Sequence, residues 1–112
     1  MIFVEICQDD KGKITSFTMS GHAEFAEKGQ DIVCAGASAV AFGSINAVIS
    51  LTGITPDIEQ TESGFLSCTI PGDLPVDTSE RVQLLLEAMA ISLQTIERDY
   101  KEYINITFKN RG

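Results

Sequence analysis

Within residues 2–8, the large aliphatic residues Ile2, Val4 and Ile6 occupy every second position, and the residues between them fall on the other side of an extended chain. This period of two is typical of a strand with one buried face. The polar cluster at 9–13 predicts a turn, after which residues 14–19 resume with β-branched and aromatic side chains. The N-terminal part of the chain therefore predicts a β-hairpin.

The regular spacing of apolar residues is lost over residues 21–32, and a connection of this length in a compact domain is usually functional or mobile. From 33 to 51 the chain is apolar nearly all round and rich in small residues, which indicates a helix buried against a sheet or a second subunit. Gly53 is suited to end that helix. Because the segment lacks strong hydrophobicity and flanking charges, we expect no membrane span.

Two short strands are predicted next, at 55–60 and 64–70. Asp77, with Glu80 three residues later, resembles a capping box and predicts the start of a second helix. Apolar residues then recur at intervals of three and four positions up to Tyr100. That spacing is typical of an amphipathic helix with one buried side.

The last segment, residues 103–109, returns to alternation and places Ile104, Ile106 and Phe108 on the inward side of a strand. The complete order of elements is ββαββαβ, which favours an α+β sandwich with two helices packed on one mixed or antiparallel sheet. The chain has 112 residues and no internal repeat or linker, so we expect a single domain over 1–112.

The net charge of −8 is the unusual feature of a composition that is otherwise ordinary for a globular protein. Such a surface repels phosphate and attracts basic proteins, so we expect no direct nucleic-acid binding. The acidity could equally serve only to keep the domain soluble. The odd number of cysteines, three, and the absence of a signal peptide indicate a reducing compartment, and we expect a cytoplasmic protein.

Candidate chemistry centres on Cys34 and on the only histidine of the chain, His22. Cys34 lies at the start of the predicted long helix, where the peptide dipoles favour the thiolate. His22 lies in the adjoining loop, from which an imidazole can fold back and take the thiol proton. The backbone amides of Cys34 and Ala35 could donate hydrogen bonds to an oxyanion. The pair therefore predicts a cysteine hydrolase.

Each of these residues also has a purely structural interpretation. A free cysteine is most often a small buried hydrophobic residue, and a lone loop histidine usually lies on the surface. Asp31 could orient the imidazole as a third catalytic residue, or it could cap the helix that follows. Ser38, one turn after Cys34, could hydrogen-bond near the site or bond back to its own helix. From the residues alone these alternatives stay open.

These residues also suggest a metal site, because three cysteines and one histidine could in principle bind zinc. The close paired spacings typical of structural zinc sites do not occur in the sequence, however. There is also no phosphate-binding loop, dinucleotide fingerprint or serine-centred nucleophile elbow. We therefore expect no metal and no cofactor.

The segment around the pair resembles a specific signature. Gly21-His22-Ala23, then Gly29, then the run from Asp31 to Ala35 and finally Ser38 is similar to the motif of the bacterial ribosomal-processing cysteine proteases, the Prp family. The resemblance covers the whole chain, including its length and the order of its elements. A histidine and a cysteine at this spacing, within a fixed run of small and apolar residues, are hard to obtain by chance.

The resemblance implies an endopeptidase that removes the short N-terminal extension of a large-subunit ribosomal protein, cutting between a pair of aromatic residues and a small one. It implies that His22 and Cys34 are catalytic, that Asp31 is a further acidic motif position, and that the protein is a homodimer. A ribosomal protein is strongly basic, so the acidic surface of this chain would assist their encounter.

The loop that carries His22 is then the candidate substrate loop. Gly21 and Gly29 supply unusual backbone angles or act as hinges around Ala23, and Phe25 is a candidate wall for the aromatic side chains of the substrate. The loop could close over a bound peptide. Two other functions stay open, a non-catalytic ribosome-assembly or peptide-binding module and a thiol redox sensor that uses Cys34.

Overall fold

The structure, a computed structural model, describes residues 1–27 and 30–110. It contains five strands and two helices in the predicted order ββαββαβ within these residues. Their bounds are β1 Ile2–Gln8, β2 Ile14–Gly21, α1 Ile32–Thr52, β3 Asp57–Gln60, β4 Leu66–Thr69, α2 Val76–Tyr100 and β5 Ile104–Asn110.

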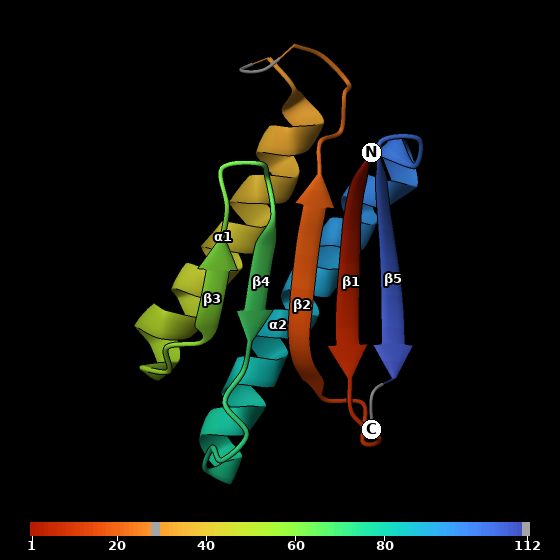
Figure 1. Ribbon diagram of the computed structural model, residues 1–112. Helices are drawn as coiled ribbons and strands as arrows, with labels where there is room; N and C mark the ends of the chain where they lie inside the picture. The colour runs from red at the N-terminus through yellow and green to blue at the C-terminus, as the bar shows by residue number, and fades with distance from the viewer. Residues whose placement is uncertain (28–29, 111–112) are drawn as a thin grey trace.

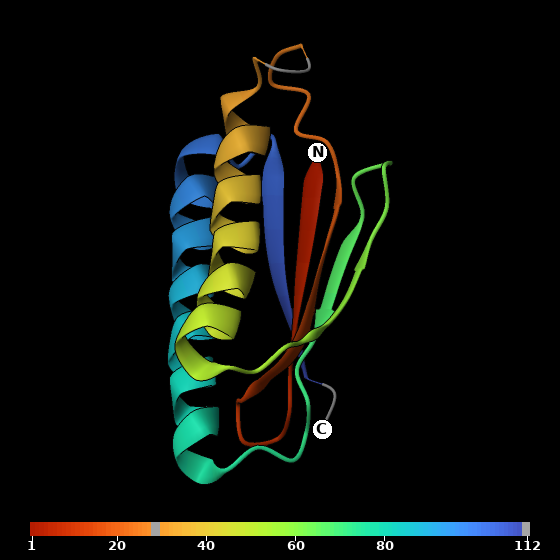
Figure 2. The same ribbon diagram turned by 90° about the vertical axis from the view of Figure 1, so that its left-hand side faces the viewer.

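The strands form one mixed sheet with the order β3-β4-β2-β1-β5 (Figure 1). β1 runs antiparallel to β2 and parallel to β5, while β4 pairs antiparallel with both β2 and β3. Both helices cover the same face of this sheet, as Figure 2 shows in side view. The predicted α+β fold with two helices on one sheet is therefore confirmed, and of the two sheet types left open by the sequence, mixed or antiparallel, the sheet is mixed.

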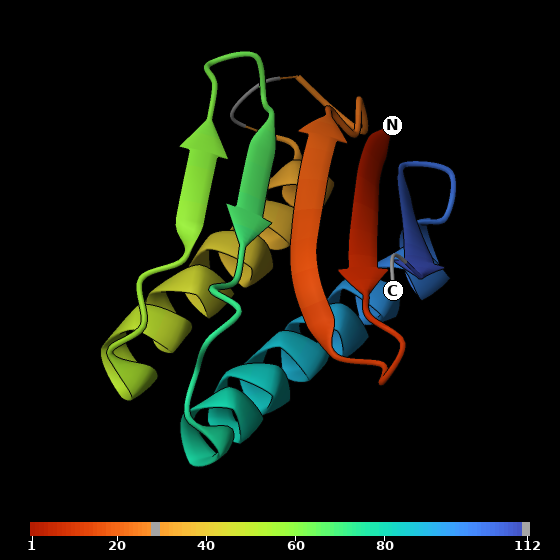
Figure 3. The same ribbon diagram turned by 60° about the horizontal axis from the view of Figure 1, so that its bottom comes forward.

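The core lies between the sheet and the helices, which run beneath the strands in Figure 3. Strand register places Ile6 opposite Phe17 and Phe17 opposite Cys68, so that these three buried side chains form one row across the sheet. Since side chains alternate along a strand, this row faces the helices, and the residues between face the uncovered side. The inward orientation predicted for the strands follows from this register.

The long helix α1 begins where Asp31 caps it and ends where Gly53 adopts a left-handed conformation, with φ +75°. Its inner side is buried and consists mainly of small or β-branched residues: Val33, Ala37, Ala41, Ile45 and Val48. Small side chains allow α1 to lie close to α2 and the sheet. By length and composition alone, α1 is the one helix of the described residues that could span a membrane, a criterion that core helices also meet.

The capping box predicted for the second helix is wrong. The second helix begins at Val76 after Pro75, which has no side chain to cap it, and the carboxylate of Asp77 accepts the N–H of Thr78 instead of forming a capping box. A proline before the first turn is favourable because its fixed φ suits a helix start. Phe108 does lie on the inward side of β5, opposite Ile6, but it is 42% exposed because it lies near the end of an edge strand.

Candidate active site

The C-terminal end of β2 directs the chain toward the start of α1. Gly21, the last residue of β2, has φ +83°, and a β-carbon at this position would collide with the carbonyl oxygen of Met1. Only glycine fits both the backbone angle and this close approach. Gly21 therefore fixes the direction in which the chain leaves β2 and enters the loop. This agrees with the unusual backbone angle predicted for it.

The loop returns to the helix through a hydrogen bond to sulfur. The N–H of Ala23 donates to Sγ of Cys34 at 3.2 Å, and the Ala23 side chain is buried at 2% exposure. Because the amide nitrogen of Ala23 is bonded to the carbonyl carbon of His22, the α-carbon of His22 lies within about 6 Å of the sulfur. The two residues of the predicted pair are thus close neighbours.

His22 and Cys34 line the same open cavity of about 650 Å³ at the start of α1. The imidazole is exposed and the thiol is half-buried. Around them the cavity is lined by Glu24, Ala26, Asp31, Ala35, Ser38 and, from the β3–β4 turn, Glu62. The structure therefore brings the predicted nucleophile and base together in one solvent-accessible space, although it forms no hydrogen bond between their side chains.

Asp31 is the only buried charged residue of the described chain, and its carboxylate accepts four backbone N–H groups. Oδ1 accepts those of Val33 and Cys34, which caps α1, and Oδ2 accepts those of Phe25 and Ala26, which holds the loop. Burial alone would raise the pKa of this carboxyl, but the backbone donors, together with the side chain of Cys34, outweigh it, and the pKa lies below its ordinary value.

These four bonds decide between the two roles that the sequence left open for Asp31. Both of its oxygens are occupied by the backbone, and neither bonds to His22. The interpretation as a helix cap is correct, and the interpretation as a third catalytic residue that orients the imidazole is not supported by this geometry. Asp31 instead joins the loop to the helix start, so it supports the site through the backbone.

The oxyanion site predicted at two backbone amides needs correction. The N–H of Cys34 donates to Oδ1 of Asp31, and the N–H of Ala35 donates to the carbonyl oxygen of Asp31 as the first bond of the helix. Neither amide is free in this structure. The amide that does point at the sulfur is that of Ala23, which sequence reasoning placed only in the substrate loop.

Phe25 does not line the cavity and is not the predicted wall for a substrate side chain. Its ring packs edge-to-face against Tyr100 at 5.7 Å and Tyr103 at 5.1 Å between ring centroids. These tyrosines belong to the end of α2 and the connection to β5. Phe25 therefore anchors the loop to the body of the protein. Gly29, also predicted in this loop, lies outside the described residues.

Two acidic residues of the cavity were not singled out from the sequence. Glu24 lies in the loop with φ 59°, a backbone angle that is uncommon outside glycine and asparagine, and Glu62 comes from the β3–β4 turn. Nothing in the sequence indicated that this distant turn reaches the site. Ser38 does line the cavity, but its hydroxyl makes no hydrogen bond to a described residue, so neither bond predicted for it forms.

The other two cysteines, Cys7 and Cys68, are buried. Burial, together with the negative charge of Asp57, raises the pKa of the Cys68 thiol to about 11. Such a thiol stays protonated and unreactive at neutral pH. Within the described residues, no three histidine, cysteine or acidic side chains are grouped so as to hold a metal ion. Cys34 is the cysteine with access to solvent.

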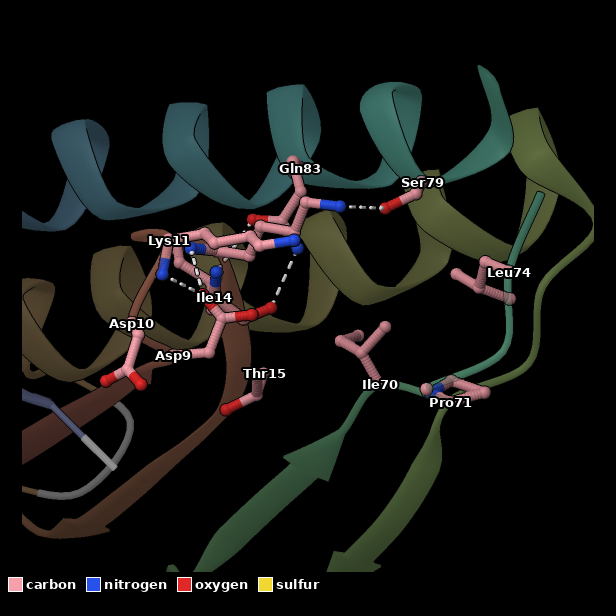
Figure 4. Close-up of a pocket in the computed structure, with 12 residues that line it drawn as sticks. Asp9, Asp10, Lys11, Ile14, Thr15, Ile70, Pro71, Leu74, Ser79 and Gln83 are labelled. Carbon is pink, nitrogen blue, oxygen red and sulfur yellow. Dashed lines mark hydrogen bonds between the residues drawn. The ribbon is translucent and has the colours of Figure 1, made fainter. Parts of the chain in front are cut away.

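A second cavity, of about 400 Å³, lies at the opposite end of the molecule beside the β1–β2 turn (Figure 4). There the side-chain amide of Gln83 bonds both the N–H of Ile14, at 2.7 Å, and its carbonyl oxygen, at 2.8 Å. Asp9 accepts the backbone N–H groups of Lys11 and Lys13. These contacts join α2 to the hairpin, so the second cavity surrounds a structural connection.

Comparison with known proteins agrees with this geometry. A family model described as cysteine protease Prp matches residues 1–105. The ribosomal processing cysteine protease Prp of Bacillus subtilis is 50% identical over 99 residues, which are 88% of each chain.

Two structures of the S. aureus ribosomal processing protease Prp have the same fold. One, in complex with a covalently linked product peptide, has a TM-score of 0.88 and 45% identity; the other, in complex with a substrate peptide, has a TM-score of 0.83 and 44% identity. Each match covers 97% of this chain and 100% of the other. With a thiol and an imidazole in one cavity and these relatives over nearly its whole length, the chain belongs to the Prp family of cysteine proteases.

Proposed function

We propose that this cysteine protease removes the short N-terminal extension of a large-subunit ribosomal protein, with Cys34 as nucleophile and His22 as general base and acid. One observation carries the assignment of the residues. His22 and Cys34 line the same cavity, and the amide that follows His22 bonds directly to the sulfur. The ring therefore needs only side-chain rotation to reach the thiol.

The first half of the reaction forms an acyl-enzyme. The imidazole of His22 takes the thiol proton of Cys34, and the thiolate attacks the carbonyl carbon of the scissile peptide bond. The C–N bond then breaks, the imidazolium gives its proton to the departing amine, and a thioester remains on Cys34. The N–H of Ala23 already points at the sulfur, where it stabilises negative charge before the attack.

The second half of the reaction releases the other product. His22 takes a proton from water as the water oxygen attacks the thioester carbonyl. The C–S bond breaks, the N-terminal fragment leaves as a carboxylic acid, and the proton returns to the thiolate of Cys34. Thiol and neutral imidazole are restored, so the cycle consumes only one water molecule for each peptide bond.

The charge of the molecule supports a basic substrate. The whole chain has a net charge of −8, and Glu24 and Glu62 line the same cavity as the catalytic pair. Ribosomal proteins are basic, so attraction at long range would raise the rate of encounter and would fall with added salt. The S. aureus relative was solved with a substrate peptide in place, which supports recognition of an extended segment.

A homodimer in the cytoplasm completes the proposal. The outer side of α2 exposes Leu84 and Ile91, at 67% and 63%, on the same helix face, next to a shallow groove that Ala39 and Gly43 of α1 help to line. A second copy would cover these apolar groups. Light scattering tests the homodimer: it should give twice the monomer mass for the native chain and the monomer mass for Ile91→Glu.

Free cysteines without disulfides fit a reducing compartment, in line with the proposed cytoplasmic location.

Incubation of the protein with the ribosomal protein precursor, followed by mass spectrometry of the precursor's N-terminus, tests the function. We expect one cleavage near the N-terminus, no detectable cleavage by Cys34→Ala, and a rate reduced about 100- to 10,000-fold in His22→Ala. Gln30→Ala, an exposed change in the same loop away from the cavity, should cleave normally. An intact precursor after long exposure to the reduced native enzyme would contradict the proposed substrate.

The same variants separate the two other functions. A binding module would retain its activity in Cys34→Ala, whereas a redox sensor would need Cys34 but not His22. Loss of cleavage in both variants, with binding of the peptide preserved, is the pattern that only a thiol protease gives.

A further inference from the structure

The turn that joins β3 to β4 reaches the active-site cavity. The turn is held by its own backbone, because the N–H of Thr61 donates to the carbonyl oxygen of Phe65 and the N–H of Gly64 donates to that of Thr61. Gly64 has φ +93°, and Glu62 of the same turn lines the cavity. Because these hydrogen bonds lie within the turn, its backbone resists displacement by a neighbouring side chain, and the turn forms one wall of the cavity.

The imidazole of His22 lies directly against this wall. A β-carbon added to Gly64 would be 2.9 Å from Cε1 and 3.2 Å from Nε2 of the ring. The next atom it would meet, at 3.4 Å, is the carbonyl oxygen of Gly21, at the end of β2. The ring therefore occupies the space that any side chain at position 64 would need.

The exposed imidazole of His22 makes no hydrogen bond or ion pair with any described residue, so its contact with the β3–β4 turn is the restraint on its orientation that the described residues offer. The neighbour that the structure places against the ring is the backbone of Gly64. Asp31, which could have oriented the ring, is fully used by backbone N–H groups. The orientation of the ring thus depends on its contact with the β3–β4 turn and not on a hydrogen-bond partner.

We propose that Gly64 is a positioning residue for the catalytic base: the absence of a side chain there lets the β3–β4 turn support the His22 imidazole where it can reach Cys34. This inference rests on the proposed role of His22 as base. A methyl group at position 64 would displace the ring before the backbone, because the ring is the end of a rotatable side chain and the turn is bonded internally. The fold would persist while the base moves.

The chain contains a matched control for this substitution. Gly12, in the turn between β1 and β2, has φ +82°, donates its N–H to the carbonyl oxygen of Asp9, and has no atom within 4 Å of an added β-carbon. Alanine at either position therefore suffers the same kind of backbone strain. Only at position 64 does the new methyl group meet another group, the imidazole of His22.

The experiment compares Gly64→Ala with Gly12→Ala for thermal unfolding, precursor cleavage and alkylation of Cys34 by iodoacetamide. Similar falls in melting temperature are expected, but kcat/KM should drop about 100-fold only in Gly64→Ala, mainly through kcat. The ratio of alkylation rates at neutral and alkaline pH, which reports the ionised thiol, should fall toward that of His22→Ala. Gly64→Asn and Gly12→Asn form a second pair of variants for the same comparison, because asparagine adopts a left-handed backbone more readily than alanine.

The double variant with His22→Ala gives the decisive result. If Gly64 acts through the ring, Gly64→Ala should change Cys34 alkylation no further once the ring is absent. Equal cleavage by the position-64 and position-12 variants, with His22→Ala inactive, would overturn the role of Gly64 and leave the proposed function intact. Native cleavage by His22→Ala would instead overturn the role of His22 as base, and with it this inference.

Discussion

The two ends of the sheet carry cavities of different kinds. At the end beside the β1–β2 turn, Gln83 pairs with both polar groups of the Ile14 backbone and Asp9 pairs with the turn. At the other end, a buried carboxylate is equally saturated by four backbone N–H groups, yet an imidazole and a thiol remain in contact with open space.

This difference shows how a structural connection and a reactive site can use the same side-chain types. Asp9 and Asp31 each accept backbone N–H groups and each shape a turn. What distinguishes the active end is that its loop holds the proposed base and nucleophile, His22 and Cys34, in addition to backbone groups. Substitutions at the active end should therefore alter catalysis, and substitutions at the other end should alter stability only.

The largest effect in this comparison is expected from Asp31→Asn. Asparagine keeps one acceptor oxygen for the start of α1 but presents an N–H₂ group to the loop amides of Phe25 and Ala26, which then lose their acceptor. The loop that carries His22 should be released, and kcat/KM for precursor cleavage should fall about 10- to 100-fold. Helix content, measured by far-UV circular dichroism, should change little.

The same variant has a signature in its dependence on pH. Because the folded-state pKa of Asp31 is below its ordinary value of 3.8, its ionised form stabilises the fold fully above that value, and this contribution is lost as the pH falls through the folded pKa. Native protein and Asp31→Asn should therefore differ most in melting temperature at neutral pH and converge in acid. A difference that grew in acid would contradict this assignment.

A smaller effect is expected from Phe25→Ala, which removes the edge-to-face contacts with Tyr100 and Tyr103. The loop loses its anchor but keeps its bonds to Asp31, so we expect about a tenfold loss of kcat/KM and about 1 kcal/mol of the free energy of unfolding. Phe3→Ala, on the uncovered face of the sheet at 55% exposure, is the matched control. Equal activity of the two variants in a cleavage assay would show that the ring contacts do not matter for catalysis.

The smallest effect on activity is expected from Gln83→Ala at the other end of the molecule. Removing this amide leaves the buried backbone of Ile14 without two partners, which should lower the free energy of unfolding by about 1–3 kcal/mol in urea denaturation. kcat/KM should equal that of the native enzyme at temperatures where the variant is folded. A catalytic defect in folded Gln83→Ala would show that the two ends are coupled.

Local chemistry made much of the site predictable from the sequence. Aspartate before an apolar run indicates a helix cap, and Asp31 is one; a glycine after such a run indicates its end, and Gly53 is left-handed. The hairpin, both helices and the order of elements along the chain also follow from spacing alone. Cys34 and His22 share a cavity because a loop and the helix it precedes are necessarily close.

Contacts between distant segments could not be predicted in this way. No sequence pattern connects Phe25 with Tyr100, or Gly64 with the ring of His22, because strand order and register bring these residues together. The use of the Cys34 amide by Asp31 escaped prediction for another reason. A helix cap and an oxyanion site compete for the same donors, and only coordinates show which acceptor is present.

The parallel pairing of β1 with β5 has a practical consequence for anyone who labels or immobilises this enzyme. Both strands start at the end of the sheet that carries the cavity of His22 and Cys34, the proposed entrance for the substrate (Figure 1). The carbonyl oxygen of Met1 lies there, close to Gly21. An affinity tag fused ahead of Met1 would emerge beside the entrance and crowd an incoming polypeptide. A tag fused after β5 would leave from the far end of the sheet, clear of the entrance.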